Sequence, residues 1–135
     1  MKKDFVSYNQ QLALKELGFN EPCIGFYNID LDILPIINEP YTTNSKDGAI
    51  LFSQAFRFFE DKKRSYASIL NGKNEEGAIY FYYEIVHYFG IDETRYCETP
   101  FLKREEAESA CLDKLIEIAK TNVWEKQTNL NRLVD

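Results

Sequence analysis

Histidine and cysteine, the side chains that build most metal centres and disulfide frameworks, are scarce in this chain. Its 135 residues include one histidine and three cysteines. Cys23, Cys97 and Cys111 are an odd number and show no CxxC or Cys/His spacing, so neither a disulfide framework nor a zinc site is indicated. We therefore expect reduced, mostly buried thiols, and neither a metal nor a cofactor.

Long apolar runs are also missing. No stretch approaches the roughly 18 apolar residues of a transmembrane helix. The N-terminal sequence MKKDFVSYNQQ is polar where a secretory signal would be apolar. We expect a cytoplasmic protein without membrane contact.

Basic residues are fewer than acidic residues. Sixteen Lys and Arg stand against 22 Asp and Glu, giving a formal net charge of −6, which favours solubility and repels phosphate backbones at long range. The 44% of hydrophobic residues and 15% of aromatic residues are far from the composition of disordered chains. We expect one folded domain over residues 1–135. Its tail over 122–135 is polar apart from Trp124, Leu130, Leu133 and Val134, so the tail either packs through these anchor side chains or is loosely packed.

Sequence motifs of catalysis are absent as well: there is no GxSxG, no phosphate-binding glycine loop and no HExxH. Asp30 and Asp32 share a strand face in IDLDI and, with Glu39, offer oxygen ligands for Mg²⁺. Paired carboxylates at a hairpin edge more commonly prevent edge-to-edge aggregation. A metal-dependent enzyme therefore ranks below a protein without enzymatic activity.

A second enzymatic alternative uses His87 as the base for a thiolate at Cys97 or Cys111. No local motif supports this pair. A lone histidine on the apolar side of a strand is more often a hydrogen-bonded core residue, and Cys111 in AESACLDKL suits a small core position.

The stretch AIYFYYEIVHYF, from Ala78 to Phe89, is the most informative part of the chain. In a strand, alternate side chains point to opposite faces. One face is apolar except for His87 and comprises Ile79, Phe81, Tyr83, Ile85 and Phe89. The other comprises Tyr80, Tyr82, Glu84, Val86 and Tyr88. We predict that the first face is core and that Tyr80, Tyr82 and Tyr88 form a binding surface, unless helices cover them as a second core layer.

The same rings suit base stacking, with a basic patch supplied by Arg57, Lys62, Lys63 and Arg64. The net charge argues against nucleic acid. A basic run at a helix end is also what the helix dipole favours.

Hydrophobic periodicity and turn residues predict an α+β fold: an antiparallel sheet of four to five strands with three helices, in the order α-β-β-α-β-β-(β)-α. The expected helices are Ser7–Leu17, Ala49–Lys63, started by Ser45 or Asp47, and Arg104–Thr121. The expected strands are Cys23–Asn28, Leu31–Ile37, Ser65–Leu70, Ala78–Phe89 and Arg95–Thr99. Residues 38–48 read as the main surface loop. The expected core contains Phe52, Phe56, Phe59, Phe81, Ile85, Leu115 and Ile118.

Three segments, LALKELGFNEPC, FSQAFRFFEDKK and EEAESACLDKLIEIAK, resemble uncharacterised small proteins of bacteriophages and prophages of anaerobic bacteria. The resemblance spans Phe5 to Lys120 and implies a phage-associated setting but no activity, since those proteins have none established. The sequence KREEAE departs from the pattern by lacking a Ser or Thr cap. The last helix is also similar to the closing helix of double-stranded-RNA-binding domains, but glutamates largely replace the basic residues, so RNA binding is not implied.

The sequence therefore predicts a small, non-enzymatic binding protein that uses the tyrosine face or the 38–48 loop to engage a protein partner or itself. The alternative is a single-stranded nucleic-acid-binding protein that uses the same rings.

Overall fold

The computed structural model describes the backbone of residues 4–23, 25–27, 33–35 and 48–134, and the side chains of residues 4–23 and 48–121. The helices are α1 (Tyr8–Glu16), α2 (Phe52–Lys63) and α3 (Arg104–Val134). The strands are β1 (Gly25–Tyr27), β2 (Ile33–Pro35), β3 (Gly48–Ala49), β4 (Ser65–Lys73), β5 (Ile79–Phe89) and β6 (Asp92–Phe101). The α+β class and the predicted element order are confirmed, with β3 as an added short strand.

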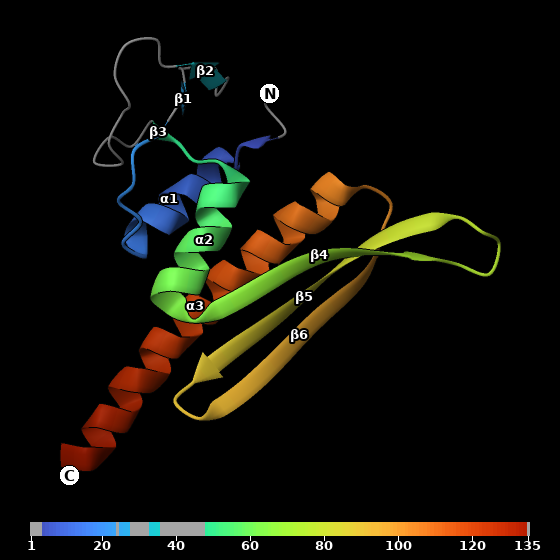
Figure 1. Ribbon diagram of the computed structural model, residues 1–135. Coiled ribbons are helices and arrows are strands. Elements are labelled where there is room, and N and C mark those ends of the chain that lie inside the picture. The colour runs from blue at the N-terminus through green and yellow to red at the C-terminus, as the bar shows by residue number, and fades with distance from the viewer. Residues whose placement is uncertain (1–3, 24, 28–32, 36–47, 135) are drawn as a thin grey trace.

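The described strands form two sheets rather than the predicted single sheet of four to five strands. Strands β4, β5 and β6 form an antiparallel meander in that order, and the short strands pair in the order β2-β1-β3. With two or three residues each, the short strands offer few ladder hydrogen bonds. They lie next to α1 and α2, apart from the long sheet (Figure 1).

Helix α1 forms where its capping residues predict it. The Gln10 N–H donates to Ser7 Oγ and the Ser7 N–H donates to Gln10 Oε1, which completes a capping box. Gly18 ends the helix with a φ of +100°, and the Phe19 N–H donates to the Leu14 carbonyl. Phe19 thereby folds back beside Leu14, as the sequence predicts, and both side chains are buried.

Helix α2 begins later than predicted. Ala49 belongs to β3, and Leu51 is the residue before the first helical turn. Leu51 has no side-chain oxygen to cap the helix, but its own N–H donates to Gln54 Oε1 at 3.1 Å. The prediction that Ser45 or Asp47 starts this helix is wrong, because the chain pairs as β3 before it turns into the helix.

The two hairpins of the long sheet extend further than predicted. Strand β4 continues to Lys73, and the turn before β5 is built on Asn74, whose side-chain oxygen accepts the N–H groups of Glu76 and Ala78. Strand β6 begins at Asp92, directly after a tight turn at Gly90, whose φ is +62°.

Helices α2 and α3 pack on one face of the β4-β5-β6 sheet, and α1 packs on α3 (Figure 1). The core between them holds five of the seven predicted side chains, namely Phe52, Phe59, Ile85, Leu115 and Ile118. Phe56 is partly buried at its margin. Phe81 is also only partly buried and lies outside the cluster, so its prediction as a core residue is wrong.

The apolar face of β5 is covered only along its middle. Tyr83, Ile85 and His87 are buried, whereas Ile79 is 57% exposed. The β4-β5 hairpin extends beyond the helices (Figure 1), so they do not reach the start of β5. Helix α3 continues from the predicted end at Thr121 to Val134, and the predicted anchor side chains beyond Thr121 lie outside the described side chains.

Candidate binding face

The face of the β4-β5-β6 sheet opposite the helices carries the predicted tyrosines. Strand alternation and register place the following side chains there, and we call this set the open face: Tyr66, Ser68, Leu70, Gly72, Tyr80, Tyr82, Glu84, Val86, Tyr88, Glu93, Arg95 and Cys97. None of the described helices packs on it.

The rings of the open face support one another in two pairs. The Tyr80 and Tyr82 ring centroids lie 6.1 Å apart, and those of Tyr66 and Tyr88 lie 5.8 Å apart in an edge-to-face arrangement. Tyr80 lies over Gly72, where a Cβ atom would stand 2.5 Å from the Tyr80 hydroxyl oxygen. The glycine therefore makes room for the ring.

These contacts leave the rings accessible. Tyr80, Tyr82 and Tyr88 are partly exposed and Tyr66 is 47% exposed. Tyr83, the neighbour of Tyr82 in sequence, is 2% exposed because it points to the helices. The described helices thus do not cover the predicted binding residues as a second core layer.

Charges are few on the open face. Arg95 Nε donates to Glu93 Oε1 at 2.7 Å, so these two side chains form an ion pair. Glu84 is exposed at the middle of the central strand, opposite Ser68 on one side and Cys97 on the other. Its carboxylate makes no hydrogen bond or ion pair with a described residue.

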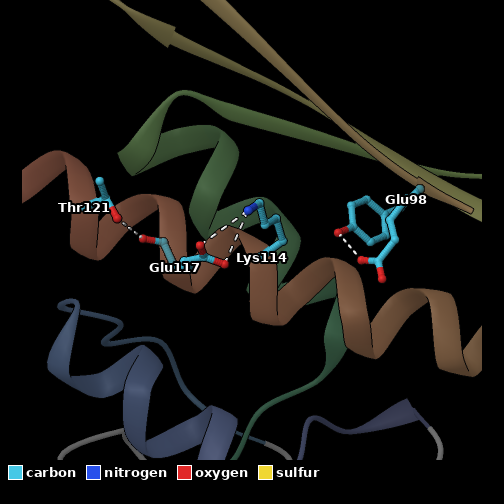
Figure 2. Close-up of polar contacts among 5 residues, drawn as sticks. Glu98, Lys114, Glu117 and Thr121 are labelled. Carbon is cyan, nitrogen blue, oxygen red and sulfur yellow. Dashed lines mark hydrogen bonds and ion pairs between the residues drawn. The ribbon is translucent and has the colours of Figure 1, made fainter.

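The helix-facing side of the sheet has a different chemistry. The Tyr83 hydroxyl donates to Glu98 Oε2 at 2.7 Å (Figure 2), and burial together with this bond raises the Tyr83 pKa. His87 is 7% exposed, with its Nδ1 2.7 Å from Ser65 Oγ. The expectation of a buried, hydrogen-bonded core histidine is confirmed.

A pocket of about 350 Å³ lies between this side of the sheet and α3. Within α3, Lys114 Nζ lies 3.4 Å from Glu117 Oε1 and Thr121 Oγ1 donates to the Glu117 carbonyl (Figure 2). Lys114 Nζ also lies 5.1 Å from the centre of the Tyr96 ring, which joins α3 to the sheet. Since these contacts engage three of the polar side chains at the pocket in the packing of the fold, we rank the pocket below the open face.

The cysteines do not favour a His–Cys pair. Cys97 is exposed on the open face, across the sheet from His87, as the strand register shows. Cys111 is buried, and burial raises the pKa of its thiol to about 12, so the thiol stays protonated. Burial also raises the pKa of Cys23, to about 11.

Three of the four residues of the predicted basic patch lie away from the tyrosine rings, whereas the Arg64 carbonyl accepts the Tyr88 N–H at 3.1 Å. Arg57, Lys62 and Lys63 belong to α2, on the other side of the sheet. Lys63 lies over the Phe58 ring, and Arg64 is the left-handed residue that ends the helix. Asp30, Asp32, Glu39 and most of the 38–48 loop lie outside the described residues.

Sequence reasoning missed the share of β4 in this face. Tyr66 and Leu70 are four residues apart in β4, so they share a face, and they stand opposite Val86 and Tyr82. The pairing register of β4 with β5 is what adds them to the surface.

Within the described part of the chain, no helix is long and apolar enough to cross a membrane. The same residues contain no group of three or more His, Cys, Asp or Glu side chains placed to hold a metal ion.

Comparison with protein-family models, with curated proteins and with solved structures gives no match. The resemblance to small phage proteins therefore stays a prediction.

Proposed function

We propose that this chain is a small, non-enzymatic binding protein that uses the open face to engage a protein partner or a second copy of itself. The observation that carries the proposal is the position of Tyr66, Tyr80, Tyr82 and Tyr88 on the sheet face that the described helices leave uncovered. Tyrosine contributes a large contact area at low conformational cost, together with a hydroxyl group for hydrogen bonding.

The arrangement of the rings supports this function. Edge-to-face and tilted pairs hold the side chains in place before a partner arrives, which lowers the entropy lost on binding. The hydroxyl groups allow the rings to face water while no partner is bound. Protein interfaces are enriched in aromatic side chains for these reasons.

The charges favour a protein over single-stranded nucleic acid as the partner. A nucleic-acid surface combines stacking rings with a basic groove. Here the open face carries one positive and two negative side chains, and the basic residues of α2 lie on the other side of the sheet.

Site-specific photocrosslinking in the cells that make the protein tests the proposal. Benzoylphenylalanine replaces Tyr82 in one variant and Ile91 in the control, because Ile91 is also exposed and apolar but lies in the β5-β6 turn. We expect a discrete protein adduct from position 82 that survives nuclease treatment, and none from position 91. A nuclease-sensitive adduct would establish the nucleic-acid alternative, and equal adducts or none at position 82 would contradict the proposal.

A further inference from the structure

Glu84 is the charged group that any ligand of the open face has to accommodate. It occupies the middle of the central strand, and the side chains of Tyr82 and Val86 stand about 7 Å away on either side along the same face. A partner surface that covers Tyr82 and Val86 therefore also covers the Glu84 carboxylate.

Covering a carboxylate removes its hydration. An ionised carboxylate that is buried without a counter-charge is strongly unfavourable, whereas a hydrogen-bonded ion pair offsets much of the loss. A partner can bind across the centre of this face only if it offers Glu84 a positive charge or several hydrogen-bond donors.

The open face does not supply that charge from its own described residues. Arg95, its one cation, points along β6 to Glu93 at 2.7 Å. In the strand register, Arg95 stands opposite Val86 and not opposite Glu84. While Arg95 pairs with Glu93, the counter-charge or the hydrogen-bond donors for Glu84 come from the partner.

We propose that the partner is a protein segment that presents an arginine side chain, which pairs with Glu84 while its guanidinium group lies against the ring of Tyr82. This inference rests on the proposed function and specifies the chemistry of the partner. Arginine fits better than lysine because a planar guanidinium forms two hydrogen bonds to one carboxylate and also stacks on aromatic rings. The same arrangement disfavours a phosphate backbone, which would place negative charge against Glu84.

NMR titration of the full chain with terminally blocked Leu-Arg-Leu, Leu-Lys-Leu and Leu-citrulline-Leu peptides measures this recognition. Citrulline keeps the shape of arginine and removes its charge. We expect amide shifts centred on residues 82–86 and the facing part of β4, with the arginine peptide at least fivefold tighter than the citrulline peptide and the lysine peptide between them. Glu84→Gln should weaken the arginine peptide at least fivefold.

Glu105→Gln is the matched control, because Glu105 is an exposed carboxylate in the first turn of α3, outside the open face. It should leave the arginine peptide's affinity unchanged. Equal binding of the arginine and citrulline peptides, shifts centred away from β5, or an affinity that Glu84→Gln does not change would overturn the inference. If the photocrosslink from position 82 persists in such a case, the proposed function stands and only the arginine specificity fails.

Discussion

The two faces of the β4-β5-β6 sheet differ although the same strands build them. On the helix side, Tyr83 and Ile85 are 2% and 0% exposed and pack against the core. On the open side, Tyr82 and Tyr88 are partly exposed, and Glu84 between them is exposed. Adjacent residues of β5 thus lie in different environments.

The comparison separates the face that stabilises the fold from the face for which we propose binding. The buried side chains of the helix face pack with those of α2 and α3 in one core, so they hold the sheet to the helices. The open face holds rings that contact one another but no described helix. Mutations on the first face should change the free energy of unfolding, and mutations on the second should change binding.

Phe59→Ala is expected to have the largest effect. Phe59 is fully buried in the core, so its truncation leaves a cavity and should cost about 3 to 5 kcal/mol in the free energy of unfolding. Urea denaturation followed by circular dichroism measures the loss. Phe56→Ala is the control on the same helix, and it should cost less because Phe56 is partly exposed. Equal losses would place Phe56 in the core as well.

Mutations at two neighbouring residues of β5 should differ clearly in their cost to the free energy of unfolding. Ile85→Ala should cost about 2 to 5 kcal/mol, because Ile85 is fully buried on the helix face. Val86→Ala, on the open face, should cost about 1 kcal/mol, near the centre of the distribution for point mutations. The same urea titration measures both. A larger loss at Val86 than at Ile85 would reverse the assignment of the two faces.

Tyr80→Ser together with Tyr82→Ser should leave the protein folded. The pair loses the cross-strand and ring contacts of an open sheet face, which contribute about 0.2 to 1 kcal/mol each. Thermal unfolding measures this loss, and sedimentation velocity measures self-association. Ile91→Ser with Leu102→Ser is the control, since it removes exposed apolar groups outside the open face. Unfolding of the tyrosine double mutant would show that the rings are core.

The rate of thiol modification in the native protein should distinguish the exposed cysteine from the two buried ones. At pH 8, Cys97 should react rapidly with a disulfide reagent, because it is exposed. Cys23 and Cys111 should react only on unfolding, since both are buried and their thiol pKa values are raised to about 11 and about 12, which keeps the thiolate fraction low. Denatured, unreduced protein should show all three thiols. Rapid reaction of two or three thiols in native protein would contradict this placement.

Much of this arrangement follows from local sequence signals. Ser7, Gln10 and Gly18 predict α1, because capping depends on contacts within a few residues. The alternation in β5 predicts which residues face the core at its centre. Both signals act over short distances along the chain, and the structure confirms both predictions.

The errors come from long-range contacts. The grouping of strands into two sheets depends on which strands meet in space, which local sequence patterns do not reveal. The exposure of Ile79 and the partial burial of Phe81 depend on how far the helices extend along the sheet, which β5 alone cannot reveal. The tyrosine face was identified from β5, but the contribution of Tyr66 required the register of β4.

Tyrosine nitration in the native protein, mapped by mass spectrometry, tests most directly the claim that one sheet face is open and the other is covered. Nitration requires an accessible ring and proceeds through the phenolate. We expect Tyr66, Tyr80, Tyr82 and Tyr88 to be modified, and Tyr83 to be protected by burial and by its raised pKa. Protection of Tyr80, Tyr82 and Tyr88 to the same degree as Tyr83 would show that the face is covered and would contradict the account.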